Sequence, residues 1–358
     1  MEKIIEKIMR EIKNAGFDSF VVGGYVRDYL LGKKSYDVDI CTNALPKDIH
    51  KIFNINMNNY GGTNLKIGKY NIDITTFREE LKYVGRNPVE VRYINDLKQD
   101  LMRRDFTINT ICMDIDGNII DYLNGIEDLN NRVIKSVGNA DAKLKEDPLR
   151  IIRTIRFYAV LDFRIDDELK KALKDNYYLV ETLSKTKIKE EISKILMNKN
   201  YKKALDLFQD LGINNVLNIT YDNPIFTTDL IGMFAQIKID GLPFTKEEKK
   251  NIIKITEVVK TEEINNLTLY KYGLYICSIA GQILSYNYKE LSKKYNNLPI
   301  KSVKDIAITS DCLINKLNIP KYKISTVYSD LEKQILMGKL KNKTKDIIKY
   351  IKESEFGE

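Results

Sequence analysis

The spacing of apolar residues changes once along the 358-residue chain, near residue 140, and this change limits the folds that the chain can adopt. Between about 18 and 135, short segments alternate apolar with polar residues or end in glycines, which is typical of β-strands. From "DPLRIIRTIRFYAVL" onward, apolar residues recur at helical spacing. We therefore expect an α/β head with a mixed, largely antiparallel sheet, followed directly by an elongated all-α part.

Several segments of the head have signatures of their own. "SFVVGG" is an apolar run closed by glycines, so it predicts a strand that enters a tight turn, and "YVRDYLLG" predicts a short helix after it. "SYDVDICT" alternates and predicts a strand with Asp37 and Asp39 on one face. "ICMDIDGNIIDY" carries Asp116-Gly117 between two alternating runs, which predicts a hairpin.

Composition excludes several classes of protein. The formal net charge is +8, which is compatible with a nucleic-acid partner and does not require one. The four cysteines are scattered, which disfavours a zinc site or a disulfide framework. His50 is the single histidine, so a histidine-rich metal site is excluded. The charged N-terminal segment does not resemble a signal peptide, and no apolar run is long enough to span a membrane, so we expect a cytoplasmic protein.

Asp37 and Asp39 form the first candidate site. Residues i and i+2 of a strand point to the same face, so the two carboxylates lie side by side and repel each other. A divalent cation relieves this repulsion, and hard oxygen ligands suit Mg²⁺. Two such ions support in-line phosphoryl or nucleotidyl transfer. An Asp-X-Asp pair alone is also typical of charge on an exposed strand, so the assignment needs a second signal.

The glycines just before this strand provide that signal. Gly23 and Gly24 stand between a predicted strand and a predicted helix, and Arg27 follows within one turn. Glycines let backbone N–H groups approach a phosphate closely, and an arginine pairs with the same oxygens. The segment lacks the Gly-Lys-Ser/Thr of a P-loop and is not a dinucleotide-binding fingerprint. We therefore expect a triphosphate and its metal ions to bind here together.

A series of motifs then follows in a recognisable order. "GGYVRDYLLGKKSYDVDI" resembles the first motif of the class II tRNA nucleotidyltransferase and bacterial poly(A) polymerase family, whose head has the nucleotidyltransferase fold. The further matching segments are "RRDFTINTI" (103–111), "DYLNGIEDLNNRVIKSVG" (121–138), "EDPLRIIRTIRF" (146–157) and "IKEEISKIL" (188–196). The last departs from the family, because lysine stands where an arginine often precedes the acidic pair. The resemblance covers roughly residues 15–200.

In "RRDFTIN", Arg103, Arg104 and Asp105 can hold ribose hydroxyl groups and phosphate oxygens. The resemblance implies that this segment recognises the ribose, and therefore that the substrates are ribonucleotides. An isolated Arg-Arg-Asp would otherwise indicate a surface salt bridge.

"EDPLRIIRTIRF" is the most informative motif. Asp147 and Arg150 are three residues apart, so they are expected to share a helix face, one accepting and one donating hydrogen bonds. Cytosine and adenine each present an amino donor beside a ring-nitrogen acceptor, which matches this pair. Uracil and guanine present the reverse pattern, and buried mismatches of this kind are costly. The pair therefore predicts selection of CTP and ATP. Arg153 and Arg156 follow Arg150 at intervals of three residues on the same predicted helix, and we expect them to reach the phosphates.

Two further features are left open. Asp73, in "NIDITTFR", is a third carboxylate on a neighbouring strand, and it fits either a catalytic role or an ordinary strand charge. Residues 78–91 are polar and resemble the family's flexible loop, which helps to switch specificity from C to A. The loop has full length, which disfavours a variant that adds only CC.

The resemblance implies a template-independent RNA polymerase that adds CCA to the 3′ end of tRNA from CTP and ATP and releases pyrophosphate. Asp37 and Asp39 would be its catalytic residues and would hold two Mg²⁺ ions. An A-adding enzyme of a split pair and a poly(A) polymerase stay open as alternatives. A non-catalytic RNA-binding relative is disfavoured because the motif residues are intact.

We expect four parts along the chain. These are a catalytic head (1–140), a helical neck with nucleotide selection (141–200), a helical body (201–290) and a helical tail that binds tRNA (291–358). Between Lys321 and Lys352 the tail has nine lysines against three acidic residues. Such a run indicates either a solvated face or contacts with RNA phosphates.

Overall fold

The computed structural model describes the chain except for residues 1, 57, 59–60, 85–86, 355 and 357–358, together with the side chains of 82–84 and 87–89. Contacts divide the chain into two compact units. Unit 1 comprises residues 1–219 and 240–242, and unit 2 comprises 220–239 and 243–358. No helix in the described part of the chain is both long and apolar enough to cross a membrane.

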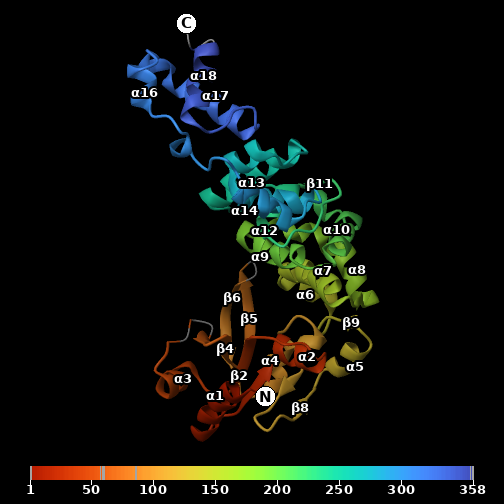
Figure 1. The fold of residues 1–358 in the computed structure, drawn as a ribbon. Coiled ribbons are helices and arrows are strands. Elements are labelled where there is room, and N and C mark those ends of the chain that lie inside the picture. The colour runs from red at the N-terminus through yellow and green to blue at the C-terminus, as the bar shows by residue number, and fades with distance from the viewer. Residues whose placement is uncertain (1, 57, 59–60, 85–86, 355, 357–358) are drawn as a thin grey trace. The chain divides into compact units, whose positions relative to one another are not determined.

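The head of unit 1 contains the strands and helices from the N-terminus to residue 134 (Figure 1). They are α1 (Lys3–Asn14), β1 (Ser19–Val22), α2 (Gly24–Leu30), β2 (Asp37–Thr42), α3 (Pro46–Phe53), β3 (Gly62–Ile67), β4 (Tyr70–Thr76), β5 (Arg78–Val84), β6 (Asn87–Tyr93), α4 (Leu97–Met102), β7 (Cys112–Met113), β8 (Ile119–Ile120), α5 (Gly125–Asn130) and β9 (Val133–Ile134). The strands predicted around "SFVV" and "SYDVDICT", the helix between them and the hairpin at Asp116-Gly117 are confirmed.

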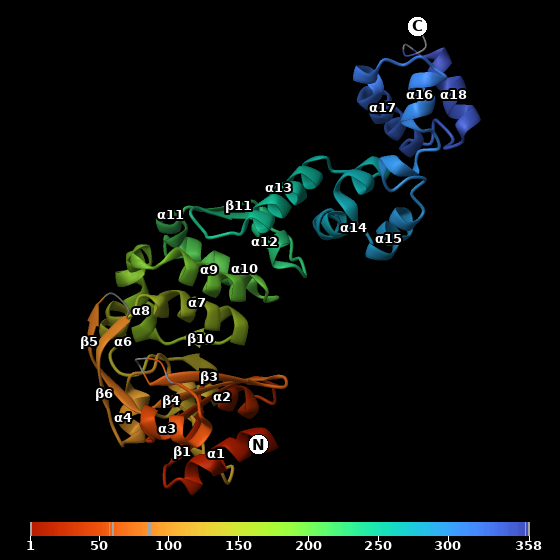
Figure 2. The same ribbon diagram turned by 90° about the vertical axis from the view of Figure 1, so that its left-hand side faces the viewer.

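The central sheet has the strand order β3-β4-β2-β1-β7-β8. Only the β2–β4 pair is parallel within it, so the sheet is mixed and mostly antiparallel, as predicted. Helices α1 and α3 lie side by side in both ribbon views (Figures 1 and 2). Ile8 and Ile12 of α1 and Ile49 of α3 are buried, because each helix presents an apolar stripe to the core.

The two faces of β2 have different surroundings. Val38 and Ile40 point to one face and are buried. Asp37, Asp39 and Cys41 point to the other, where Cys41 packs with Val22, Phe77, Leu97, Leu101 and Cys112. The apolar core beneath Cys41 therefore supports the same face of the sheet that carries the two aspartates.

Helices dominate the rest of unit 1. They are α6 (Ala140–Glu146), α7 (Leu149–Leu161), α8 (Asp167–Asn176), α9 (Lys185–Leu196), α10 (Tyr201–Asp210) and α11 (Ile213–Leu217), with the short strand β10 (Arg164–Ile165). Strand β10 pairs in parallel with β9 and so ties this part to the head. Helix α7 packs against both α9 and α10, so its apolar residues form the core of the helical part.

Unit 2 is helical apart from two short strands. Its elements are β11 (Ile219–Tyr221, which begins at the end of unit 1), α12 (Leu230–Gln236), β12 (Ile237–Ile239), α13 (Lys246–Lys260), α14 (Asn266–Ile283), α15 (Tyr288–Asn296), α16 (Ser310–Asn315), α17 (Ile324–Leu336) and α18 (Thr344–Glu353). Helix α13 begins at a capping box formed by Thr245 and Glu248, which satisfies the free N–H groups of its first turn. The apolar residues of α13 to α18 form one buried cluster. The mostly antiparallel head followed by helices confirms the predicted fold class.

The described residues of 78–91 differ from the expected flexible loop, and residues 85–86 lie outside the described part of the chain. Strands β5 and β6 pair as an antiparallel hairpin, with register shifts between residues 80 and 83. Polar residues still dominate this segment because a two-stranded hairpin outside the central sheet has little apolar surface to cover. A polar segment can therefore form two paired strands, which composition alone does not reveal.

Candidate active site

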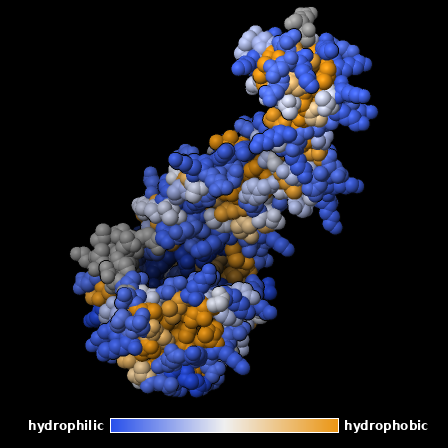
Figure 3. Space-filling model, turned by 60° about the vertical axis from the view of Figure 1, so that its left-hand side comes forward, coloured by the Kyte–Doolittle hydropathy of each residue, from blue (hydrophilic) through white to orange (hydrophobic). Residues whose placement is uncertain are grey.

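A cavity of about 650 Å³ opens within unit 1. The space-filling view shows a hollow with a largely hydrophilic surface (Figure 3). Every site residue predicted from the sequence borders this central cavity: Gly23, Gly24, Arg27, Asp37, Asp39, Arg103, Arg104, Asp105, Asp147, Arg150, Arg153 and Arg156. Segments more than a hundred residues apart in the sequence thus meet at one place.

Asp37 and Asp39 border the cavity from β2. Burial raises the pKa of Asp39 above its ordinary value, Arg104 acts in the opposite direction, and Asp73 and Asp37 raise the pKa further. Asp73 lies opposite Asp39 in the β2–β4 register, but it is not among the residues that line the cavity. Its carboxylate instead accepts a hydrogen bond of 2.7 Å from Asn64.

Gly23 allows the chain to pass close to Asp39. Its φ is +80°, a conformation that L side chains rarely adopt. A Cβ at this position would lie 3.0 Å from Asp39 Oδ2 and 3.8 Å from an Arg104 Nη1 atom. A larger residue at position 23 would therefore displace the carboxylate that we assign to the site.

Asp100 holds the two arginines of the "RRD" motif, and sequence reasoning missed it. Its side chain is fully buried and lies 2.9 Å from Arg103 Nε and 3.5 Å from Arg104 Nη2. Burial would raise the pKa of Asp100, but Arg103 and Arg104 lower it below its ordinary value. Burial likewise opposes the charge of Arg104, yet Asp100 and Asp39 raise its pKa. Both groups stay ionised across the physiological range.

A second chain of contacts joins the head to α7. Arg27 Nη1 donates to Asn109 Oδ1 at 2.7 Å, and Asn109 Nδ2 donates to Asp105 at 3.0 Å. Asp105 then accepts from Arg153 Nε at 2.8 Å. Burial would raise the pKa of Asp105, but Arg153 holds it well below its usual range. The Arg27 side chain also contacts Asp28, so its guanidinium is fixed from two sides.

An acidic residue of α9 forms an ion pair with an arginine of α7. Glu191 is buried and lies 2.8 Å from Arg156 Nη1. Burial lowers the pKa of Arg156 to about 10. The guanidinium groups of Arg27, Arg153 and Arg156 lie 5.1, 5.5 and 4.4 Å from the ring centroid of Phe157. Phe157 and Glu191 belong to quoted motifs, but only the fold shows that they position the arginines.

The prediction that Asp147 and Arg150 share a helix face is wrong, because Asp147 lies outside α7. Asp147 lies between α6 and α7 with an extended backbone, and its Oδ1 accepts from Leu149 N at 3.1 Å. Helix α7 begins at Leu149, because Pro148 precedes it and Asp147 satisfies its first N–H. Both side chains nevertheless border the central cavity.

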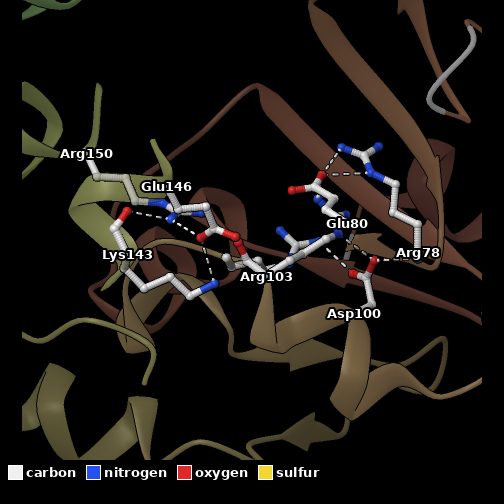
Figure 4. Close-up of polar contacts among 8 residues, drawn as sticks. Arg78, Glu80, Asp100, Arg103, Lys143, Glu146 and Arg150 are labelled. Carbon is white, nitrogen blue, oxygen red and sulfur yellow. Dashed lines mark hydrogen bonds and ion pairs between the residues drawn. The ribbon is translucent and has the colours of Figure 1, made fainter. Parts of the chain in front are cut away.

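Arg150 is held in place by oxygens from three residues (Figure 4). Its Nη1 donates to the Lys143 carbonyl at 2.8 Å and to the Glu146 carboxylate at 2.5 Å. Its Nη2 donates to the Arg103 carbonyl at 2.9 Å. The carboxylate of Glu146 in turn accepts from Lys143 Nζ at 3.1 Å. The side chain is thus fixed before any ligand binds.

The β5–β6 hairpin contacts Asp100 and Arg103. Arg78 donates to Glu80 from Nε at 2.9 Å and from Nη2 at 2.7 Å. Glu80 lies 3.6 Å from Arg103 Nη1, and the Arg78 backbone N–H donates to Asp100 at 3.1 Å (Figure 4). Arg103 therefore joins the hairpin to Arg150, because its side chain contacts Glu80 and its carbonyl oxygen accepts a hydrogen bond from Arg150.

The donor set of the cavity fits a divalent metal ion. Asp37 and Asp39 supply hard carboxylate oxygens. Burial raises the pKa of Asp39 most, and the negative charges of Asp73 and Asp37, which a cation would offset, raise it further. Among the described residues, no cluster of three histidine, cysteine or acidic side chains forms a complete metal site. A metal at this pair would therefore complete its coordination with oxygens from a substrate or from water.

Comparisons with known proteins agree with this geometry. Three family models match the chain: the poly A polymerase head domain (19–135), the probable RNA and SrmB-binding site of polymerase A (162–219) and tRNA nucleotidyltransferase domain 2 (232–351). The CCA-adding enzyme of Lactobacillus johnsonii is 31% identical over 96% of this chain and 95% of its own. That of Ligilactobacillus salivarius is 31% identical over 97% and 95%.

The fold is also that of a solved protein. The CCA-adding enzyme of Bacillus stearothermophilus, crystallised in complex with CTP, superimposes with a TM-score of 0.82 at 23% identity, over 99% of this chain and 98% of its own. The sequence relatives extend over nearly the whole chain, and the fold agrees with them over the same length. The chain therefore belongs to the CCA-adding enzyme family of tRNA nucleotidyltransferases.

Proposed function

We propose that this protein adds CCA to the 3′ end of tRNA, using CTP and ATP and releasing pyrophosphate. The observation that carries this proposal is the central cavity, which combines a carboxylate pair, a wall of arginines and the Asp147–Arg150 pair. The relatives named CCA-adding enzyme and the CTP complex of the structural neighbour support it.

We assign Asp37 and Asp39 as the catalytic residues and as ligands of two Mg²⁺ ions. Bound there, such ions neutralise phosphate charge and lower the pKa of the attacking 3′-hydroxyl group. The protein's own part is to hold the two carboxylates side by side on β2, with Gly23 packed against Asp39. The apolar core beneath Cys41 fixes the strand that carries them.

The arginines of the cavity form the proposed site for the triphosphate and the ribose. We assign Gly24, Arg27 and Arg104 to these groups, together with Gly23. Arg104 Nε is buried and has no hydrogen-bond partner within the described part of the chain. A ligand oxygen would satisfy this donor, whose burial without a partner is otherwise costly. Arg103, Asp105, Arg153 and Arg156 complete the nucleotide-binding set in this proposal.

Asp147 and Arg150 are the proposed readers of the base. Cytosine and adenine offer an amino donor to Asp147 and a ring-nitrogen acceptor to Arg150, whereas uracil and guanine offer the reverse. The anchors of Arg150 on Lys143, Glu146 and Arg103 keep it from turning to meet a mismatched base. Selection therefore needs no nucleic-acid template.

The remaining assignments extend this proposal. We propose that residues 1–140 form the catalytic head, 141–200 the neck with nucleotide selection, 201–290 the body and 291–358 a tRNA-binding tail. We also propose a cytoplasmic location, where the four free cysteines stay reduced. An A-adding enzyme and a poly(A) polymerase are the alternatives that the following experiment separates.

The direct test supplies tRNA that ends at the unpaired base before CCA, with CTP, with ATP or with both. We expect two additions with CTP alone and three with both nucleotides, read as single-nucleotide steps on a sequencing gel. Addition of A only to tRNA that already ends in CC would identify an A-adding enzyme. Long A tails on unrelated RNA would identify a poly(A) polymerase.

Asp39→Asn should abolish nucleotide addition without unfolding the protein. Because the folded state raises the pKa of Asp39, the ionised carboxylate destabilises the folded protein. This destabilisation is complete above the raised pKa and absent below the ordinary aspartate pKa. Removing the charge should leave the thermal midpoint without metal unchanged or higher at pH 7. It should also remove the stabilisation that Mg²⁺ gives the wild type. Retained Mg²⁺ stabilisation would refute the metal assignment.

Arg150→Ala should weaken the discrimination against UTP and GTP by at least tenfold in kcat/KM, because the buried donor of the pair is lost. Arg164→Ala serves as the matched control, since Arg164 is exposed on β10 and lies outside the cavity. Competition between labelled CTP and UTP on one tRNA measures the ratio. Unchanged selectivity in Arg150→Ala would contradict the assignment of the base reader.

A further inference from the structure

A second cavity of about 270 Å³ is bordered by α2, by the segment between α2 and β2, and by the start of β4. Arg27 of α2 borders the central cavity, whereas Tyr25 and Tyr29 of the same helix border the second. Asp37, the first residue of β2, borders the central cavity, and Tyr36, which directly precedes that strand, borders the second. The two cavities therefore adjoin at the start of β2.

Tyrosines and lysines dominate the second cavity, which we call the tyrosine–lysine pocket. It is bordered by Tyr25, Tyr29, Tyr36 and Tyr70 and by Lys33, Lys34 and Lys69, with Glu2 and Ser35. The rings of Tyr36 and Tyr70 meet edge to face at 5.8 Å. Lys69 Nζ lies 4.9 Å from the Tyr36 ring and 5.2 Å from the Tyr70 ring.

The exposed groups of this pocket suit an unpaired polynucleotide. Tyr29 and Tyr36 are 53% and 45% exposed, so their rings offer faces to a ligand, whereas Tyr25 and Tyr70 are buried and form the wall. Lys33, Lys34 and Lys69 are exposed and bring three positive charges against the single carboxylate of Glu2, which hydrogen-bonds Tyr70. Stacking rings beside ammonium groups are typical of single-stranded nucleic-acid sites.

We propose that the tyrosine–lysine pocket binds the unpaired 3′-terminal segment of the RNA substrate just upstream of the growing end. This inference rests on the proposed function, which requires an RNA end to reach Asp37 and Asp39. That end is single-stranded, because it grows without a template strand, so its bases are free to stack on aromatic rings. A strand leaving the central cavity over the start of β2 meets Tyr36 first, since Tyr36 directly precedes Asp37.

Two sets of variants test the pocket by the affinity for tRNA that ends in CC, whose 3′ end carries the unpaired base and the two cytidines. The triple variant Lys33→Ala/Lys34→Ala/Lys69→Ala should weaken binding at least tenfold and lower the salt slope of log Kd by about 2. The matched control is Lys47→Ala/Lys51→Ala/Lys66→Ala, which removes three exposed lysines of the same unit outside the pocket and should bind like the wild type.

Tyr36 separates stacking from charge. Tyr36→Ala should weaken tRNA binding about tenfold, and Tyr36→Phe should not, because it keeps the ring. The KM for CTP should stay unchanged in every pocket variant. With an RNA duplex that lacks unpaired 3′ nucleotides, the variants and the wild type should bind equally.

Three outcomes would overturn the proposal: equal losses in the two lysine triples, equal losses with the blunt duplex, or pocket variants that bind tRNA as the wild type does. The proposed function fails separately, when the wild-type protein adds no nucleotide to tRNA. Unfolding midpoints of all variants, measured alongside, exclude loss of folded protein as the cause of weak binding.

Discussion

The partly buried ion pair between Asp105 and Arg153 is the contact on which the rest of the site depends. It joins the "RRD" segment of the head to α7, so the two walls of the central cavity meet through it. Removing one partner of a fully buried pair leaves a charge without compensation, at a cost of about 3–5 kcal/mol, and solvent contact with Arg153 lowers that cost here. Asn109 and Arg27 extend the same chain toward the glycine turn.

Positive charge crowded into one cavity is stable only because carboxylates lie behind it. Asp100 pairs with Arg103 and Arg104, Glu191 with Arg156, and Glu146 with Arg150. These acidic groups fix the guanidinium planes in advance, so less conformational freedom is lost when a nucleotide binds.

The sequence was sufficient for residues that act through local geometry. Alternation along β2 placed Asp37 and Asp39 on one face, and the glycines marked the turn beside them. It was not sufficient where contacts are long-range. Asp100 and Glu191 look like ordinary helix charges until the fold brings arginines to them.

Local rules also failed in two informative places. The helix that carries Arg150 begins after Pro148, because Asp147 caps it from an extended position, and spacing alone cannot distinguish a cap from a first turn. Residues 78–91 read as a polar loop but form a hairpin whose Glu80 reaches Arg103. The tyrosine–lysine pocket was missed for a related reason, since its rings come from α2, β4 and the segment before β2.

A double-mutant cycle on Asp105 and Arg153 tests the central claim most directly. Asp105→Asn, Arg153→Gln and the double variant would be compared with the wild type by the dissociation constant for CTP, measured by calorimetry. The account predicts that each single change raises the dissociation constant for CTP at least tenfold. It also predicts that the double variant binds CTP as tightly as the weaker-binding single variant, or more tightly. Independent, multiplying effects, or singles that bind CTP normally, would contradict it.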